Sequence, residues 1–512
     1  MLVNNFLEES ARRYPDKIAL ITPDGRYTYR EIDEMANKIT HSLLTEGLVK
    51  GERVAIFMDN SVEVVVSLFG VLKTGGIFLI VNPTTKSEKL TYILNNCRAS
   101  VVISSMPKLS VLKEATCDTP SVKIIYLAGD NIPSREVFAK KTFPLREIFS
   151  CNNGHKPNSH MIDLDLATII YTSGSTGNPK GVVMTHFNMV FAANSITQYL
   201  ENIPEDIILN VLPLSFDYGL YQVLMGFKMG ATVILEKTFL YPYKVIDTIL
   251  KENVTGFPIV PTISAILLQM EDVRKLDLSH LRYISNTAAA LPPVHIQKLR
   301  EFFPKTKIYS MYGLTECKRV SYLPPDQLDV RPASVGKAMP NTEVYIVDEE
   351  GKKVGPGIVG ELVVRGASVM RGYWEMPEET AQKLKPGQYP GEMLLYTGDL
   401  FKMDEEGYLY FVARQDDIIK SRGEKVSPKE VENILYEIDG VIEAAVTGVH
   451  DDVLGEAIKA YIVLKVGSDL TEKDILRFCS RHLEDFMVPK YVEFRKELPK
   501  TSTGKISKRG LL

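Results

Sequence analysis

Residues 169–182 read IIYTSGSTGNPKGV, an apolar run that opens at once into glycine, serine and threonine. The run that ends at Tyr171 is typical of a buried strand. In the segment that follows, glycines let backbone amides approach an anion, hydroxyl groups donate hydrogen bonds and Lys180 supplies positive charge. The stretch therefore predicts a strand followed by a loop that binds a triphosphate.

The spacing within this loop excludes a phosphate loop of the Walker type. A Walker loop needs Gly-Lys followed by Ser or Thr after a four-residue gap, whereas Lys180 is followed by Gly181. A flexible polar linker is the other interpretation, but so many small and hydroxyl residues directly after a strand argue against it. The predicted phosphate-binding residues are Thr172, Ser173, Gly174, Ser175, Thr176, Gly177 and Lys180.

The rest of the chain alternates between strand-like and helix-like segments. Short β-branched runs begin at positions 53, 100, 122, 231 and 307, with amphipathic segments elsewhere, which indicates βαβ units and mostly parallel, buried sheets. From about Thr342 the strands are shorter, and a polar crossing at 414–417 predicts a domain boundary. The predicted fold class is α/β. A large N-terminal domain, residues 1–414, contains parallel-type sheets with helices and a β-rich subdomain, and a small α+β C-terminal domain spans residues 415–512.

The bulk composition excludes several classes of protein. Lys and Arg number 60 against 64 Asp and Glu, for a net charge of −4, which is unlike a basic surface built for nucleic acid. The 5 cysteines are odd in number and lack CxxC spacing, so neither a disulfide framework nor a zinc site is expected. These thiols fit a reducing cytoplasm, and the first residues lack the apolar core of a signal peptide. No uninterrupted apolar run reaches the ~18 residues of a membrane span.

The segment YTSGSTGNPKGV, residues 171–182, closely resembles the phosphate-loop signature of the adenylate-forming superfamily. This superfamily includes acyl- and aryl-CoA synthetases, amino-acid adenylation domains and beetle luciferases. Further stretches match in the expected order from residue 171 to residue 508, so the resemblance covers nearly the whole chain. It implies that the chain binds ATP through this loop and that its small C-terminal domain is mobile.

A second matching stretch is SMYGLTEC, residues 310–317. Tyr312, Gly313, Thr315 and Glu316 match an aromatic-Gly-x-Thr-Glu element of the family. An aromatic ring can stack on adenine, and a carboxylate suits Mg²⁺, which prefers oxygen ligands. The resemblance implies that Tyr312 stacks on the base, Thr315 bonds the phosphate and Glu316 carries the metal.

Later matches implicate the remaining nucleotide and catalytic residues. By resemblance Asp399 in YTGDL accepts from both ribose hydroxyls, Arg414 contacts the ribose and Asp416 occupies the hinge position. Lys505 in PKTSTGK matches the catalytic lysine, which neutralises charge as the bond at phosphorus changes. Gly423 matches the position beside the incoming pantetheine thiol, where a side chain would obstruct the tunnel. The stretch from 360 to 374 matches a segment expected to support the nucleotide site.

Two stretches depart from the family pattern. In ISNTAAALPP, residues 284–293, the adenine positions Thr287 and Ala288 lie where Gly-Gly or Ala-Gly is more usual. In LPLSFDYGLYQ, residues 212–222, Asp217 replaces the histidine of many acyl-CoA synthetases. Asp217 could cap the next helix, pair with the α-ammonium of an amino-acid substrate or serve another purpose. The candidate substrate-binding residues are Asp217, Tyr218, Tyr221, Ser285 and Met311.

The resemblance predicts an AMP-forming ligase that uses ATP and Mg²⁺ to convert a small carboxylic acid to an acyl adenylate. The acyl group then passes to a thiol, most simply that of CoA, in an acyl-CoA synthetase reaction. A stand-alone enzyme that loads an amino acid onto the phosphopantetheine of a separate carrier protein is the alternative. A nucleotide-binding regulatory protein without catalysis is a third interpretation, which the presence of Glu316, Asp399, Arg414 and Lys505 opposes.

Overall fold

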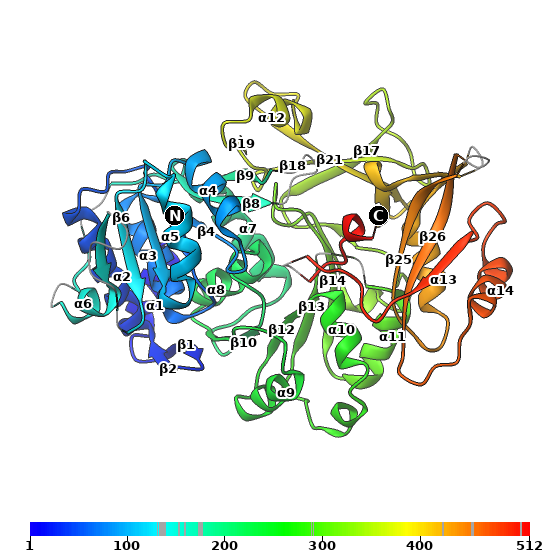
Figure 1. Cartoon of the computed structure of the whole chain (residues 1–512), viewed down its shortest axis with the longest axis horizontal. Helices are drawn as coiled ribbons and strands as arrows, with labels where there is room; N and C mark the ends of the chain where they lie inside the picture. The colour runs from blue at the N-terminus through cyan, green and yellow to red at the C-terminus, as the bar shows by residue number, and fades with distance from the viewer. Residues whose placement is uncertain are drawn as a thin grey trace. The chain divides into compact units, whose positions relative to one another are not determined.

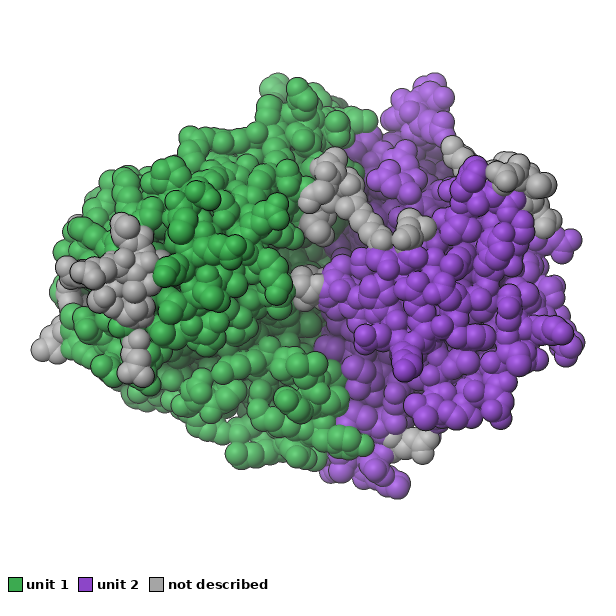
Figure 2. Space-filling view, in the orientation of Figure 1, with its two compact units in different colours: residues 1–258, 314–319, 366–393 green, residues 259–313, 320–365, 394–512 purple. Residues whose placement is uncertain are grey.

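The protein is described by a computed structural model (Figure 1). The structure describes residues 1–512 except 131, 133–139, 152–153, 158–159, 173–177, 288, 290, 422–423, 452–454, 502–503 and 512. Two compact units are distinguished in Figure 2. Unit 1 contains Met1–Pro258, Leu314–Arg319 and Gly366–Met393, and unit 2 contains Ile259–Gly313, Val320–Arg365 and Leu394–Leu512.

The first sheet of unit 1 has the order β19-β9-β8-β4-β3-β5-β6-β7. Neighbouring strands from β8 to β7 run parallel, and β9 returns antiparallel to β8. Their apolar residues pack against α4 and α5, as expected for a sheet with covered faces. The bounds are β3 (Arg53–Phe57), β4 (Ile77–Ile80), β5 (Val101–Ser105), β6 (Ile124–Ala128), β7 (Lys141–Pro144), β8 (Leu166–Thr172), β9 (Lys180–Thr185), β19 (Gly372–Tyr373), α4 (Ser87–Asn96) and α5 (Leu109–Cys117).

A second group of strands in unit 1 has the order β12-β10-β11-β1-β2. β1 is parallel to β11 and antiparallel to β2, so the edge of this group is a hairpin. The bounds are β1 (Ile18–Thr22), β2 (Gly25–Thr28), β10 (Ile207–Asn210), β11 (Thr232–Leu235) and β12 (Gly256–Ile259). The short β20 (Leu384–Pro386) is not part of this group. The remaining helices of unit 1 are α1 (Asn5–Arg13), α2 (Tyr29–Thr45), α3 (Val62–Thr74), α6 (Leu145–Ser150), α7 (His186–Tyr199), α8 (Asp217–Met229), α9 (Pro242–Lys251), α12 (Pro377–Lys383) and the 3-10 turn η1 (Met106–Lys108).

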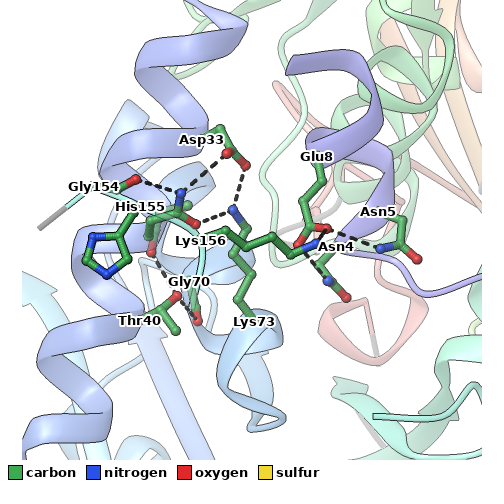
Figure 3. A network of polar contacts seen from close by, with 12 residues as sticks. Asn4, Asn5, Glu8, Asp33, Thr40, Gly70, Lys73, Gly154, His155 and Lys156 are labelled. Carbon is green, nitrogen blue, oxygen red and sulfur yellow. Dashed lines mark hydrogen bonds and ion pairs between the residues drawn. The ribbon is translucent and has the colours of Figure 1, made fainter. Parts of the chain in front are cut away.

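A buried ion pair joins α2 to α3 (Figure 3). Lys73 lies at the end of α3 and is only 1% exposed. Its Nζ donates to Asp33 Oδ1 at 2.5 Å and to Asn37 Oδ1 at 2.6 Å, both on α2. Because a buried ammonium must be compensated, these contacts constrain how the two helices pack.

Unit 2 contains three groups of strands: a small group that includes two parallel strands, a β-rich group, and the sheet of a C-terminal α+β part. β13 (Tyr283–Asn286) and β14 (Lys307–Tyr312) are parallel, and β15 (Ser321–Leu323) and β16 (Lys337–Ala338) follow antiparallel. A further group has the order β17-β18-β21 with β22 beside β21. Its strands are β17 (Thr342–Val347), β18 (Gly360–Gly366), β21 (Met393–Met403) and β22 (Leu409–Arg414), and nearby helical elements are α10 (Pro261–Leu267), α11 (Pro293–Phe302), η3 (Glu271–Lys275) and η4 (Pro325–Gln327).

The last part of unit 2 is an α+β arrangement. Its sheet has the order β24-β23-β26-β25 with β27 beside β26, and α13 and α14 contribute to one apolar core with it. The bounds are η5 (Gln415–Asp417), β23 (Ile419–Ser421), β24 (Glu424–Val426), α13 (Pro428–Tyr436), β25 (Val441–Asp451), β26 (Gly455–Leu464), α14 (Glu472–His482), β27 (Tyr491–Phe494) and η6 (Lys508–Gly510).

The predicted fold class is confirmed. Parallel-type sheets with helices, a β-rich region and a small C-terminal α+β region are all present. The predicted boundary between residues 414 and 415 is not where the contacts divide the chain, since unit 2 includes residues on both sides of it. The division into residues 1–414 and 415–512 therefore stays a prediction. Among the described residues, every helix is too short or too polar to traverse a bilayer.

Candidate active site

The predicted phosphate loop is closed by a strand pair in unit 1. Thr172 at the end of β8 lies opposite Lys180 at the start of β9. Gly181 follows, and a Cβ there would lie 2.7 Å from Ile169 Cγ2, so the close approach of the strands requires glycine. The hairpin thus brings Thr172 and Lys180 together. Five predicted phosphate-binding residues lie outside the described residues: Ser173, Gly174, Ser175, Thr176 and Gly177.

Tyr373 links Lys180 to the predicted metal-binding residue Glu316. The Tyr373 hydroxyl donates to Glu316 Oε1 at 2.7 Å, and Lys180 Nζ lies 5.5 Å from the centre of the Tyr373 ring. Tyr373 is held by β19, where it pairs with Val182 of β9. One tyrosine therefore orients the carboxylate and contacts the lysine. Sequence reasoning missed its role, although the matching stretch 360–374 contained it.

Asp217 forms a buried ion pair with Lys318. Lys318 Nζ lies 3.3 Å from Asp217 Oδ2 and donates to the backbone oxygen of Asp217 at 2.9 Å. Asp217 is the first residue of α8, Phe216 is the N-cap, and no side-chain capping bond is present. The interpretation of Asp217 as a helix cap is therefore wrong, because the helix starts one residue earlier than a cap would require. Its carboxylate instead neutralises a lysine 101 residues further along the chain.

Lys318 lies between the rings of two predicted substrate residues. Its Nζ is 4.4 Å from the centre of the Tyr221 ring and 5.5 Å from that of Tyr218. The pKa of Lys318 is lowered to about 7, chiefly by burial; Asp217 opposes this shift and the neighbouring Arg319 adds to it. The backbone of Lys318 is left-handed, with φ of +63°. Asp217, Tyr218 and Tyr221 are thus brought together around a lysine that the sequence did not assign to the site.

Unit 2 brings the predicted ribose and adenine residues together. Tyr312 ends β14, and its hydroxyl donates to Asp399 Oδ2 at 2.6 Å. Arg414 Nε donates to Asp399 Oδ1 at 3.1 Å, because β21 and β22 pair these two residues directly. Each carboxylate oxygen can accept a second hydrogen bond, so Asp399 retains capacity for ribose hydroxyls. Gly313 follows Tyr312 and ends this segment of unit 2.

Other candidates in unit 2 lie on or beside β13 and β14. Ser285 and Met311 are both buried, at 1% and 2% exposure, within these neighbouring parallel strands. Thr287 is buried just after β13, and Ala288 lies outside the described residues. Asp416 is exposed in the 3-10 turn η5, and Gly423 also lies outside the described residues.

The loop of Lys505 is a closed turn in unit 2. Thr501 N donates to Lys505 O at 2.7 Å, and Lys505 N donates to Thr501 Oγ1 at 3.1 Å. Gly504 has φ of +79°, and a Cβ there would lie 3.2 Å from Thr262 Oγ1 on α10. The turn favours glycine at 504, which lies beside the first turn of α10 and directly precedes Lys505.

Two sequence profiles match this chain. The profile described as AMP-binding enzyme matches residues 7–374, and that of the AMP-binding enzyme C-terminal domain matches residues 430–505. This chain belongs to the AMP-binding enzyme family. The predicted membership of the adenylate-forming superfamily is thereby confirmed.

Relatives of this AMP-binding enzyme include ligases and synthases. A long-chain-fatty-acid–CoA ligase of Bacillus subtilis (strain 168) is 34% identical over 100% of this chain and 94% of its own length. Bacitracin synthase 1 of Bacillus licheniformis is 30% identical over 99% of this chain but only 9% of its own length. The crystal structure of the anthranilate CoA ligase AuaEII with anthranoyl-AMP has a TM-score of 0.92 at 29% identity, covering 100% of this chain and 96% of that one. ATP-bound MatB from Rhodopseudomonas palustris has a TM-score of 0.87 at 27% identity, covering 100% and 98%.

The predicted reaction class is confirmed. This AMP-binding enzyme is an AMP-forming acid–thiol ligase that uses ATP. Magnesium, the general metal of the family, fits the residues that are present. Among the described residues no cluster of three or more metal-ligating side chains occurs, and Mg²⁺ commonly takes one or two carboxylates together with substrate phosphates. Glu316, oriented by Tyr373, suits that role.

Proposed function

We propose that this AMP-binding enzyme converts a carboxylic acid without an α-ammonium group to its CoA thioester. One observation carries this choice: the ammonium of Lys318 already pairs with Asp217, the carboxylate that would otherwise bind a substrate amine. A second cation would have to displace Lys318 from a site where both side chains are at most 9% exposed. The full-length CoA ligase relative supports CoA as the acceptor.

The predicted phosphate-binding and metal-binding residues of unit 1 act in the first half-reaction. The loop from Thr172 to Lys180 binds the phosphates, and Thr315 bonds the phosphate that is attacked. Glu316 would hold Mg²⁺, which supplies positive charge to the phosphate oxygens. Its orientation by Tyr373 supports this assignment, since a preorganised carboxylate needs no rearrangement when the metal binds.

Unit 2 supplies the residues that hold the nucleoside. Tyr312 stacks on adenine, Thr287 and Ala288 contact its edge, and Asp399 and Arg414 bind the ribose. The hydrogen bonds among Tyr312, Asp399 and Arg414 support this assignment. Lys505 neutralises charge while the acid's carboxylate attacks the α-phosphorus and pyrophosphate leaves.

The second half-reaction uses the mobile domain of residues 415–512. It rotates about Asp416, withdraws Lys505 and brings Gly423 to the thiol, which attacks the acyl carbonyl and releases AMP. The exposure of Asp416 in the turn η5, between two apolar regions, supports a hinge there. We also assign the enzyme to the cytoplasm, since its 5 cysteines are free thiols.

The experiment is substrate-dependent exchange between ATP and pyrophosphate. The acids are paired, each amino acid with its deamino analogue, alongside fatty and aromatic acids. We expect exchange with plain acids and CoA-dependent release of AMP. If only amino acids support exchange, the proposal fails and a carrier protein becomes the acceptor, the chemistry suggested by the synthase relative. Lys505→Ala is the control, since it should remove adenylation while thiolysis of a supplied acyl adenylate continues.

A further inference from the structure

The guanidinium group of Arg319 is buried in unit 1 with part of its hydrogen-bonding capacity unused. Arg319 is only 1% exposed, and its Nε and Nη1 have no hydrogen-bond partner among the described residues. A guanidinium group does not deprotonate in proteins, so it cannot escape the cost of burial by becoming neutral. A group in this situation requires a partner of opposite charge.

The neighbouring side chains that the structure describes do not supply that partner. Asp217 is already paired with Lys318, so its carboxylate is engaged. The Tyr218 ring lies 5.5 Å from Arg319 Cζ, and such a contact contributes about 2 kcal/mol when desolvated. Burial of an unpaired ion costs several kcal/mol. Among the described residues, the Nε and Nη1 of this buried guanidinium group are therefore left without a partner.

The backbone at this point is strained as well. Lys318 has φ of +63°, and a left-handed conformation costs a residue with a side chain about 1–2 kcal/mol. Strain of this kind gathers at ligand-binding positions. Here it directs two successive cationic side chains to the rings of Tyr218 and Tyr221 on α8.

The anion that would pair with Arg319 is not the triphosphate of ATP. Glu316 lies only three residues before Arg319, yet its side chain bonds Tyr373 on β19. Lys318 and Arg319 instead contact α8, the helix of the predicted substrate residues. On α8 and just before it, the buried Gln222 Oε1 and Ser215 Oγ also have no hydrogen-bond partner within the described part of the chain. Unsatisfied polar atoms thus lie on and beside the helix of the predicted substrate residues, where a substrate would satisfy them.

We infer that Arg319 binds a second carboxylate of the acyl substrate, so that the preferred acid is a dicarboxylic acid. The inference rests on the proposed function, since it names the acid that the same ligase activates. One carboxylate attacks ATP and forms the acyl adenylate with release of pyrophosphate. The other keeps its charge, pairs with Arg319 and passes unchanged into the thioester.

The test compares matched acids that differ only in the second carboxylate: butanoate with butanedioate, hexanoate with hexanedioate, and benzoate with benzene-1,3-dicarboxylate. ATP–pyrophosphate exchange gives kcat/KM for each. We expect the wild type to prefer the dicarboxylic member of a pair. Arg319→Met should lower kcat/KM for that acid by about 10²- to 10³-fold, as expected when one partner of a buried charge pair is removed. The monocarboxylic member should be unaffected or improved.

Arg13→Met is the matched control, because Arg13 is 61% exposed and its ion pair among the described residues is with Glu9, one helical turn away. It should leave both acids unchanged. An equal loss of activity with both members of a pair in Arg319→Met would overturn the inference, since Arg319 would then serve the reacting carboxylate or the fold. Wild-type preference for monocarboxylic acids would overturn it too.

A measurement on the wild type covers the case in which Arg319→Met does not fold. Each acid is added without ATP and the shift in Tm is recorded. A larger shift with the dicarboxylic member supports the inference, and equal shifts contradict it. The proposed function fails separately, if no acid of either kind supports exchange.

Discussion

Replacing Tyr373 by Phe removes one hydroxyl group and keeps the ring. The ring contact with Lys180 is retained, while the 2.7 Å hydrogen bond to Glu316 is lost. A hydrogen bond to a charged group contributes about 1.5–3 kcal/mol. If that energy orients Glu316 for the metal, Mg²⁺ affinity should fall about 10- to 100-fold, the range found when such supporting bonds to metal ligands are lost.

The assay has two readouts. Isothermal titration calorimetry measures ATP binding at a series of Mg²⁺ concentrations, and ATP–pyrophosphate exchange gives the Mg²⁺ concentration for half-maximal rate. Both curves should move to higher Mg²⁺, with the maximal rate largely recovered at saturation. Tyr126→Phe is the control, since it removes a hydroxyl that bonds Ser42 in the same unit. An unchanged Mg²⁺ requirement in Tyr373→Phe would refute a positioning role for the hydroxyl.

Three further predictions concern stability and the catalytic loop. Asp33→Ala should lower the free energy of unfolding by about 3 kcal/mol, because the Lys73 ammonium then stays buried with Asn37 as its hydrogen-bond partner. Lys73→Met should lower it by less. Urea unfolding of both variants and of the double variant checks this, and simple addition of the two single losses would contradict it. Burial lowers the pKa of His186 from 6.5 to about 4, and Val3 N donates to its neutral Nδ1 at 3.1 Å. The contribution of this neutral histidine to the free energy of unfolding should therefore be fully present above pH 6.5 and fall by about 3 kcal/mol as the pH falls to 4. Melting curves of His186→Gln should lack this decline, and an identical pH profile would disprove the assignment. Gly504→Ala should slow adenylation about 10-fold, because a left-handed backbone is unfavourable for alanine. Thiolysis of a supplied acyl adenylate should continue. Equal slowing of both steps would count against a local effect on Lys505.

Local patterns were sufficient to predict the strand that contains Tyr171. An apolar run that ends at glycines and hydroxyl residues specifies β8 without reference to the rest of the chain. The pairing of Asp399 with Arg414 also follows from their positions on consecutive antiparallel strands. In both cases the determinants lie within about twenty residues of one another.

The acyl side of the site could not be predicted in this way. Two consecutive cationic residues such as Lys318 and Arg319 are expected at the surface, because lysine and arginine side chains are rarely fully buried. Only the contact with Asp217, 101 residues earlier, explains why Lys318 lies in the interior. Tyr373 likewise needs the pairing of β19 with β9 before its contact with Glu316 can be foreseen.

The segment Leu314–Arg319 belongs to unit 1, although the chain on both sides of it belongs to unit 2. It carries Glu316, Lys318 and Arg319, whereas Tyr312 and the partners that hydrogen-bond around Asp399 lie in the other unit. Six residues can therefore be exchanged with those of a relative as a single cassette. Such a graft, combined with changes in α8, would redirect acid selectivity while the nucleoside residues stay native, which makes this short insert the natural starting point for engineering new thioesters.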